Sequence, residues 1–310
     1  MKKITRRSFL TVCGAVAAAA ALTACGGSAS SAAASSSTAA GSTASSTAAA
    51  LSGNVATGGS TSMKNVIAAL TEGFAEVEPG VTVSYDPTGS GAGITGATDK
   101  TLDIGLSSRA LKDDEKNDVD GTIVALDGIA IVVNKDSKVA DLTVEQLKKM
   151  FTGEITNWKE VGGDDATIVV LNRKAGSGTR ATFEAAVFGD EAVDFKGDAE
   201  LDKSGDVQTQ MGSTDNAISY LDFSHFDDSK FNAVKVEGVE PKSKNVTDDS
   251  FKIWATEHMY CAKDADEATK AFLDFMLSDD VQGKLVEEQG FIPVSAMKVV
   301  KDASGKVSAK

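Results

Sequence analysis

The stretch TIVVLNRKAGSGT, residues 167 to 179, decides the fold class of this chain. Its first five residues are β-branched or aliphatic and favour a buried strand, and a helical pattern follows from about Thr179 to Val187. Between the two, Gly176 and Gly178 allow the backbone to turn tightly. The segment therefore predicts a strand, a glycine-rich turn and a helix in direct succession.

Strand and helix patterns alternate outward from this segment in both directions. An amphipathic helix is expected from Met63 to Phe74, where apolar residues recur every three or four positions, and a capping box that starts at Thr143 marks the beginning of another helix. This alternation predicts an α/β architecture with largely parallel sheets. Further strands are expected at residues 81–85, 122–126, 129–133 and 233–237, and further helices at 267–277 and 281–288.

Four loops rich in glycine and hydroxyl residues fall where a strand ends or a helix begins. In α/β proteins such junctions gather at one crevice, where ligands bind. Glycine lets the backbone approach a ligand closely, and the first amides of a helix point outward with the positive end of the helix dipole behind them. Together these loops predict a site for a small oxyanion. They are Gly58–Ser62, Thr88–Gly93, Gly105–Arg109 and Arg173–Thr179.

Arg173 is the candidate cation of this site, because it follows a strand and stands just before the Gly-Ser-Gly turn. Burying a bare anion can cost tens of kcal/mol, roughly, in a medium of low dielectric. Each charge-assisted hydrogen bond contributes about 1.5 to 3 kcal/mol, so one guanidinium with several amides and hydroxyls can hold a buried dianion. Arg109 either adds charge nearby or forms a structural ion pair.

Composition narrows the classes of function. The formal net charge of −14 repels nucleic acid and anionic membrane surfaces. The sequence contains two histidines and three cysteines, and Cys13 and Cys25 fall in the N-terminal targeting region. Cys261 alone cannot form a cysteine metal cluster, and it is expected to be a small buried hydrophobe. We therefore expect neither a metal nor a cofactor.

The N-terminus has the pattern of an export signal followed by a tether. Basic residues within positions 2–7 precede an apolar run shorter than the ~20 residues of a spanning helix, so residues 1–24 are expected to be a signal peptide. The sequence Leu-Thr-Ala-Cys that ends at Cys25 resembles the lipobox of bacterial lipoproteins, which implies a lipid on Cys25. Residues 25–54, rich in Ser, Ala, Thr and Gly, are expected to form a flexible tether. The Arg6-Arg7 pair leaves the twin-arginine route open beside general secretion.

From about Gly53 to the end, the chain resembles the substrate-binding lipoprotein of the bacterial phosphate-specific ABC transporter. The most specific element is Arg-x-x-Gly-Ser-Gly-Thr at 173–179, and the stretch Glu-Gln-Gly-Phe-Ile-Pro-Val that ends at Val294 adds to the likeness. The resemblance implies a type II periplasmic-binding-protein fold with two lobes and two hinge crossovers. Residues 55–128 and 259–310 would form one lobe and residues 129–258 the other. It also implies a monomer outside the cytoplasm, anchored by its lipid to the outer face of the cell membrane, that passes inorganic phosphate to a permease.

The same resemblance implies a set of phosphate contacts, with two departures. Some family members have an aspartate where this chain has Ser108, and a second acidic position corresponds to Ala175. Such a carboxylate accepts a proton from phosphate and repels sulfate, so its loss puts this discrimination in doubt. The implied contacts are Thr61, Ser62, Ser90, Ser108, Arg173, Ser177, Gly178 and Thr179.

Three alternatives stay open beside a phosphate-binding protein. The bound anion could be another tetrahedral oxyanion, such as sulfate or molybdate. A secreted phosphatase or esterase is disfavoured, because residues 88 and 175 break the Gly-x-Ser-x-Gly spacing of a nucleophile elbow and no phosphate-binding P-loop occurs. We therefore expect a protein that is not an enzyme. A surface adhesin or signalling ectodomain with the same fold is the third alternative.

Overall fold

The computed structural model describes residues 50–116, 119–189, 191, 193–195, 197–301 and 307–310. The chain divides into two units, Met1–Ala50 and Leu51–Lys310, and the second unit is described here. The expected signal peptide, the expected lipid attachment at Cys25 and the tether up to residue 49 lie outside the described residues. Among the described helices, none has both the length and the apolar character needed to cross a bilayer.

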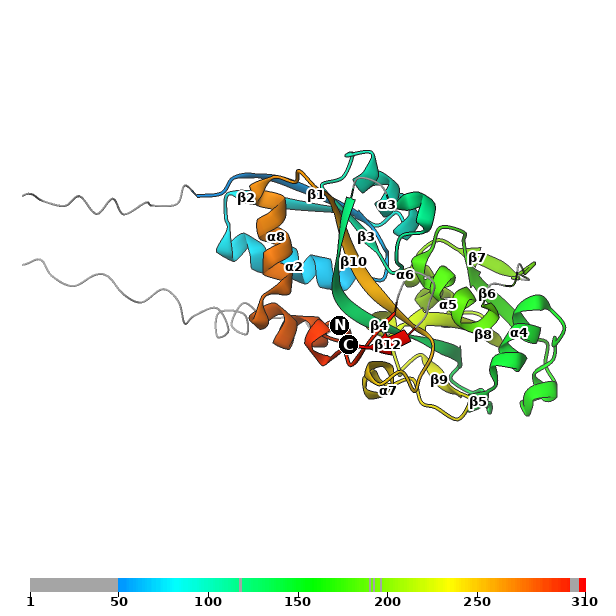
Figure 1. Cartoon of the computed structure of the whole chain (residues 1–310). Coiled ribbons are helices and arrows are strands. Elements are labelled where there is room, and N and C mark those ends of the chain that lie inside the picture. Colours follow the sequence, from blue (N-terminus) through cyan, green and yellow to red (C-terminus); the bar gives the residue numbers. More distant parts are fainter. Residues whose placement is uncertain (1–49, 117–118, 190, 192, 196, 302–306) are drawn as a thin grey trace, which may run out of the picture. The chain divides into compact units, whose positions relative to one another are not determined.

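Ten strands of the described residues form one mixed sheet. Its order is β2-β1-β3-β10-β4-β8-β6-β7, and β9 pairs with both β4 and β5 (Figure 1). The strands are β1 (Gly53–Gly59), β2 (Val81–Asp86), β3 (Ile104–Ser107), β4 (Val119–Asn134), β5 (Asp141–Leu142), β6 (Val169–Arg173), β7 (Ala199–Leu201), β8 (Ala217–Asp222), β9 (Phe231–Val236) and β10 (Trp254–Ala262); β11 (Val299–Lys301) and β12 (Val307–Ala309) form a separate pair.

Strand β4 belongs to both ends of this sheet. Up to Gly128 it pairs with β10, and from Ile129 onward it pairs with β8 and β9. We call β2, β1, β3, β10 and the first part of β4 the first half-sheet, and the remaining strands the second half-sheet. The sequence predicted two separate strands around Asp127 and Gly128, but the chain stays extended through both. A side chain at position 128 would meet the Phe223 ring at 2.2 Å, so the glycine allows this close packing.

The expectation of largely parallel sheets is correct for the outer strands of each half-sheet and wrong for the pairings that β10 and β4 make. β1 is parallel to β2 and β3, and β6 is parallel to β7 and β8. In contrast, β10 runs antiparallel to β3 and β4, and β4 runs antiparallel to β8 and β9. The parallel strands matter for function, because their carboxyl ends lie at a common edge.

Helices pack against both half-sheets. The helix predicted from Met63 is α2, and the aromatic ring of its buried Phe74 meets Phe272 of α8 at 5.2 Å. The capping box at Thr143 is present as predicted: its hydroxyl accepts from the Gln146 amide at the start of α4. The helices are α2 (Lys64–Val77), α3 (Ser90–Thr98), α4 (Val144–Thr152), α5 (Gly178–Phe188), α6 (Ser204–Met211), α7 (Ser243–Thr247), α8 (Glu267–Leu277) and α9 (Val286–Glu288), with a π-helical turn at Val281–Leu285.

Several elements were not expected from the sequence, among them β3, β8 and β10, and two of these elements, β1 and α3, border the candidate loops. Strand β1 begins at Gly53, so the predicted tether to residue 54 runs into it; this strand is held by pairing with β2 and β3 rather than by an apolar pattern of its own. Helix α3 forms within a glycine-rich stretch predicted as a loop. A side chain at Gly93 would lie 2.5 Å from the Leu106 carbonyl, so α3 packs on β3 more closely than other residues would permit.

Candidate anion-binding site

The candidate site lies where strands of both half-sheets end. Residues 60–62 follow β1, Ser108 follows β3, Arg173 is the last residue of β6 and Asp222 is the last residue of β8. The eight residues that the sequence singled out are all buried in this region. Because these strand ends come from distant parts of the chain, the fold brings four short loops to one place.

Arg173 is the central cation of this site. Its side chain is 1% exposed, and its guanidinium donates to the Thr61 hydroxyl and the Ser204 hydroxyl, each at 3.1 Å. The same group donates to the backbone carbonyls of Asp202 at 2.9 Å and Leu201 at 3.3 Å. Burial lowers the pKa of Arg173, and Asp222 opposes this shift. An arginine keeps its charge in proteins, so the result is a fixed positive charge with little freedom to move.

The start of α5 supplies amide donors. Ser177 caps this helix, because its hydroxyl accepts from the Arg180 amide at 3.2 Å. The amides of Gly178 and Thr179 belong to the first turn, where no helical carbonyl lies four residues back to accept from them. They also stand at the positive end of the helix dipole. The Thr179 hydroxyl donates to Asp222 at 2.8 Å, which holds this first turn against the end of β8.

The two half-sheets contact each other directly at this point. The Gly91 amide donates to the Gly176 carbonyl at 3.0 Å, and the Thr182 hydroxyl donates to the Ser108 carbonyl at 3.1 Å. A side chain on Gly178 would come within 2.3 Å of the Ser90 hydroxyl. The residues of the site are therefore in a closed arrangement, with donors from both sides facing each other.

Three hydroxyls and one carboxylate form the other side of the site. The Ser62 and Ser108 oxygens lie 2.7 Å apart, and Ser60 contacts both of them. Ser108 also donates to Oε2 of Glu257 at 2.9 Å. A carboxylate thus lies beside position 108, on strand β10.

Comparisons with known proteins agree with this geometry. The PBP superfamily domain matches residues 30–280. The phosphate-binding protein PstS of Bacillus subtilis is 39% identical over 260 residues, which is 83% of this chain and 86% of the relative. The chain belongs to the PstS family. Its α/β periplasmic-binding-protein fold and the resemblance inferred from residues 173–179 are thereby confirmed.

Solved structures show the same relationship for PstS-family proteins. A phosphate ABC transporter substrate-binding protein from Clostridium perfringens, crystallised with bound phosphate, has a TM-score of 0.74 and 39% identity; the match covers 78% of this chain and all (100%) of that one. An ABC-type phosphate transport receptor from Vibrio cholerae has a TM-score of 0.66 and 32% identity, covering 77% and 99% of the two chains. These relatives are binding proteins, not enzymes.

Among the described residues of this PstS-family chain, three carboxylates are buried: Asp127, Asp222 and Glu257. Asp222 accepts from Thr179 and, at 2.7 Å, from Ser204. Asp127 accepts from the Phe223 amide and the Ser224 hydroxyl. Burial, and then the neighbouring Asp222, raise the pKa values of Asp127 and Glu257 well above the usual range. Both groups therefore hold their protons to a higher pH than an exposed carboxyl does.

The raised pKa of Glu257 makes stability depend on pH. Folded Glu257 keeps a proton that the unfolded chain releases above about pH 4, so the free energy of unfolding falls by up to ~1.4 kcal/mol per pH unit as pH rises toward the folded pKa. Glutamine has no such proton. We expect Glu257→Gln to raise the melting temperature of the phosphate-free protein more at about pH 8 than at about pH 5. Thermal unfolding of both proteins checks this, and an equal difference at every pH contradicts it.

Both histidines of the PstS-family chain are buried. Burial lowers the pKa of His258 to about 4 and also lowers that of His225. His258 contacts the Thr256 hydroxyl at 2.7 Å, and His225 contacts Ser224 at 3.1 Å. The histidines change stability with pH in the opposite direction to the carboxyls. The unmodified protein and Glu257→Gln must therefore be compared at the same pH, so that the contribution of Glu257 can be separated.

Four residues of the site were missed by sequence reasoning, and three of them, Ser204, Asp222 and Glu257, had a recognisable signal. Ser60 was quoted in the first loop but not selected as a contact. Ser204 begins α6 in a Ser-Gly pair like those of the other loops. Asp222 and Glu257 are acidic residues in mostly apolar strands, a pattern that points to a special environment. Arg109, left open above, is a structural ion pair: its guanidinium makes two contacts with Glu115, at 2.6 and 2.8 Å.

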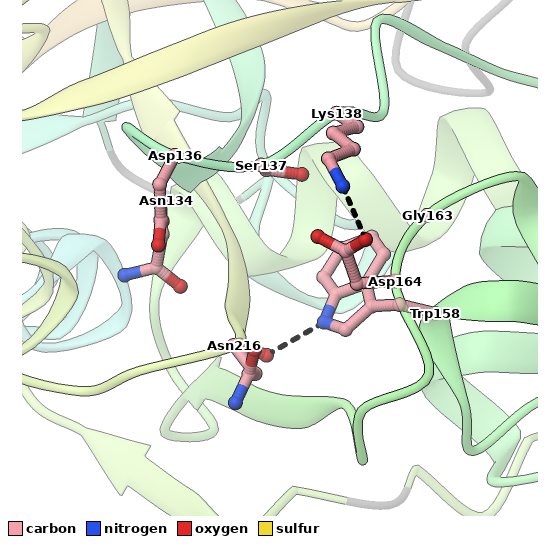
Figure 2. A pocket seen from close by; sticks show the side chains of 8 residues that line it. All are labelled: Asn134, Asp136, Ser137, Lys138, Trp158, Gly163, Asp164 and Asn216. Carbon is pink, nitrogen blue, oxygen red and sulfur yellow. Dashed lines mark hydrogen bonds and ion pairs between the residues drawn. The ribbon is translucent and has the colours of Figure 1, made fainter.

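A separate small pocket contains none of these residues (Figure 2). Its volume of about 40 Å³ leaves room for a few water molecules. The Trp158 ring donates to the Asn216 carbonyl at 2.9 Å, and the exposed Lys138 and Asp164 side chains pair with each other across the opening. Because these charges neutralise each other at an exposed position, the pocket is not a candidate anion site. It is lined by Asn134, Asp136, Ser137, Lys138, Trp158, Gly163, Asp164 and Asn216.

Proposed function

We propose that this chain captures inorganic phosphate between its two half-sheets and delivers it to the permease of an ABC transporter. The observation that carries the proposal is the buried Arg173 guanidinium, held among hydroxyls and helix-start amides from both half-sheets in a PstS-family fold. The proposed contacts are Thr61, Ser62, Ser90, Ser108, Arg173, Ser177, Gly178 and Thr179.

The energetics support a buried dianion at this place. Each charge-assisted hydrogen bond contributes about 1.5 to 3 kcal/mol, and the guanidinium, the first-turn amides of α5 and the hydroxyls together offer several. Residues that move with different half-sheets supply these donors, so binding favours the closed arrangement. We propose two lobes, 55–128 with 259–310, and 129–258; they follow the half-sheets except that the boundary before residue 259 falls within β10. The change of partners along β4 between Gly128 and Ile129 supports this division.

The proposal includes location and assembly. We propose export by the N-terminal signal, a lipid on Cys25, and a monomer held on the outer face of the cell membrane. The acidic net charge of −14 supports a body that stays in solution near that surface rather than adhering to it. Closure on phosphate would then report occupancy to the permease.

Calorimetry tests the ligand directly. Purified protein, freed of phosphate by unfolding and refolding, is titrated with phosphate, sulfate, molybdate and an amino acid mixture. We expect saturable one-to-one binding of phosphate that is tighter than binding of any other ligand. Tighter binding of sulfate or molybdate would show that this anion, and not phosphate, is the ligand. Release of product from a chromogenic phosphate ester would favour the hydrolase alternative.

A further inference from the structure

Glu257 holds an oxygen atom that the fold does not satisfy. Its side chain is fully buried, and Oε2 accepts from Ser108 at 2.9 Å. Its other oxygen, Oε1, is the one buried side-chain nitrogen or oxygen among the described residues that has no hydrogen-bond partner. Buried polar atoms are nearly always paired, so an orphan acceptor beside a candidate anion site needs an explanation.

A backbone irregularity accompanies this side chain. Strand β10 changes its register against β4 between Glu257 and His258, which marks a β-bulge or a similar irregularity. Bulges redirect side chains and are frequent next to functional sites. Because His258 pairs with Ser107 at the end of β3, Glu257 lies next to Ser108 and the hydroxyls that precede α2.

A carboxylate beside an anion is repulsive unless a proton lies between the two oxygens. Hydrogen phosphate carries such a proton on a P–OH group, whereas sulfate is fully deprotonated at neutral pH. A hydrogen bond from P–OH to Oε1 would satisfy the orphan acceptor and involves no transfer of atoms or electrons. Sulfate has no proton to offer, so at a pH where Glu257 is ionised a sulfate oxygen would face the carboxylate directly.

We propose that Glu257 contacts bound hydrogen phosphate by accepting its P–OH proton at Oε1, and that this contact is what excludes sulfate. The inference rests on the proposed function. It assigns to a residue of β10 the role of acidic proton acceptor, which the residues at positions 108 and 175 of this chain, Ser108 and Ala175, do not provide. Glu257 is therefore a specificity-determining residue at the back of the site, opposite the charge of Arg173.

Several charged or titratable groups act on Glu257 from the surrounding strands. Asp222 raises its pKa, whereas the hydroxyls of Ser108 and Ser62 lower it. When Glu257 is protonated it can donate to sulfate, so sulfate should bind better as pH falls. The other groups that interact with this cluster are Asp127 on β4, Tyr85 on β2, Tyr260 on β10 and, through Asp222, Arg173 on β6.

The variant Glu257→Gln tests the contact. Its amide can still accept from Ser108 through oxygen and can donate to a deprotonated anion oxygen through nitrogen. We expect its phosphate affinity to fall and its sulfate affinity to rise, so that the ratio of the two dissociation constants changes at least about tenfold, the effect of roughly one hydrogen bond to a charged group.

The dependence of sulfate affinity on pH provides a second test, because a purely structural role of Glu257 would not change it. In the unmodified protein, sulfate affinity should fall as pH rises, approaching about tenfold per pH unit above the pKa of Glu257, because each bound sulfate then requires a proton on that group. In Glu257→Gln the sulfate affinity should not change with pH. Titrations between about pH 5 and 9 measure this, and the profile of the unmodified protein stays informative if the variant does not fold.

Asp127→Asn is the matched control. It removes a buried carboxylate from the same cluster, but both oxygens of Asp127 already accept, from the Phe223 amide at 3.1 Å and the Ser224 hydroxyl at 3.2 Å. Its phosphate-to-sulfate ratio should stay within about threefold of the unmodified value. Suppose that the unmodified protein and Glu257→Gln both bind phosphate, with the same ratio of phosphate to sulfate dissociation constants and the same dependence of sulfate affinity on pH. The role assigned to Glu257 is then wrong, and the proposed function stands. If the unmodified protein binds no phosphate, the proposed function itself fails.

Discussion

Replacement of Arg173 by methionine should weaken phosphate binding on the order of 30- to 5,000-fold, which corresponds to the loss of about 2 to 5 kcal/mol when one member of a buried charge pair is removed. Methionine keeps a long unbranched stem, so the space that Arg173 fills at 1% exposure stays largely occupied. The variant loses the donor to Thr61, which connects the half-sheets, and the donor to Ser204 on the same side. Calorimetry with phosphate measures the effect, and circular dichroism checks that the fold is retained.

Arg109→Met provides the comparison for this result. Arg109 adjoins Ser108 in sequence, yet its guanidinium forms a partly exposed ion pair with Glu115. Its removal should leave phosphate affinity within about threefold and lower stability by ~1 kcal/mol at most. A loss in Arg173→Met of less than tenfold, or an equal loss in both variants, would show that Arg173 is not the anion's charge partner.

Gly178→Ala should reduce phosphate affinity by about tenfold or more, chiefly through faster dissociation. The new methyl group would lie 2.3 Å from the Ser90 hydroxyl and 3.1 Å from the Ser108 carbonyl carbon, so it would hold the half-sheets apart. The unbound protein can relieve this contact by opening, and alanine favours a helix over glycine. Its melting temperature without phosphate should therefore change by no more than a few degrees, roughly. Stopped-flow or surface-based kinetics separate the two rate constants.

Gly205→Ala is the control for adding a methyl group near a helix start. Gly205 is the second residue of α6, and a side chain there would meet no other atom within 4 Å. It should leave phosphate kinetics unchanged and raise stability by about 0.5 to 1 kcal/mol. If Gly178→Ala behaves like this control, the contact between Gly178 and Ser90 does not limit closure.

Local patterns were enough to predict the elements whose structure is determined locally. The capping box at Thr143 and the amphipathic face from Met63 to Phe74 both depend on neighbours within one or two helical turns, and both are present. The four loops were found for the same reason, because glycine and serine at a strand end have a local meaning. Their meeting at one place followed from a general rule for α/β sheets.

Long-range pairing is what sequence reasoning could not supply. Glu257 reaches Ser108 across 149 positions of chain because β10 runs antiparallel beside β3, and no local pattern reveals that partnership. The same holds for β1, whose residues are mostly small and which becomes a strand by lying between β2 and β3. The carboxylate that appeared to be missing was therefore a matter of topology, not of composition.

The position of β10 in the sheet order has a consequence for biogenesis. β10 joins β3 to β4, yet it consists of residues 254–262, while those neighbours are complete by residue 134. During synthesis, the first half-sheet lacks the strand that lies between β3 and β4 until most of the polypeptide has left the ribosome. Contacts of such high sequence separation form slowly. We therefore expect the first half-sheet to be completed late in folding, after residues 254–262 have been made.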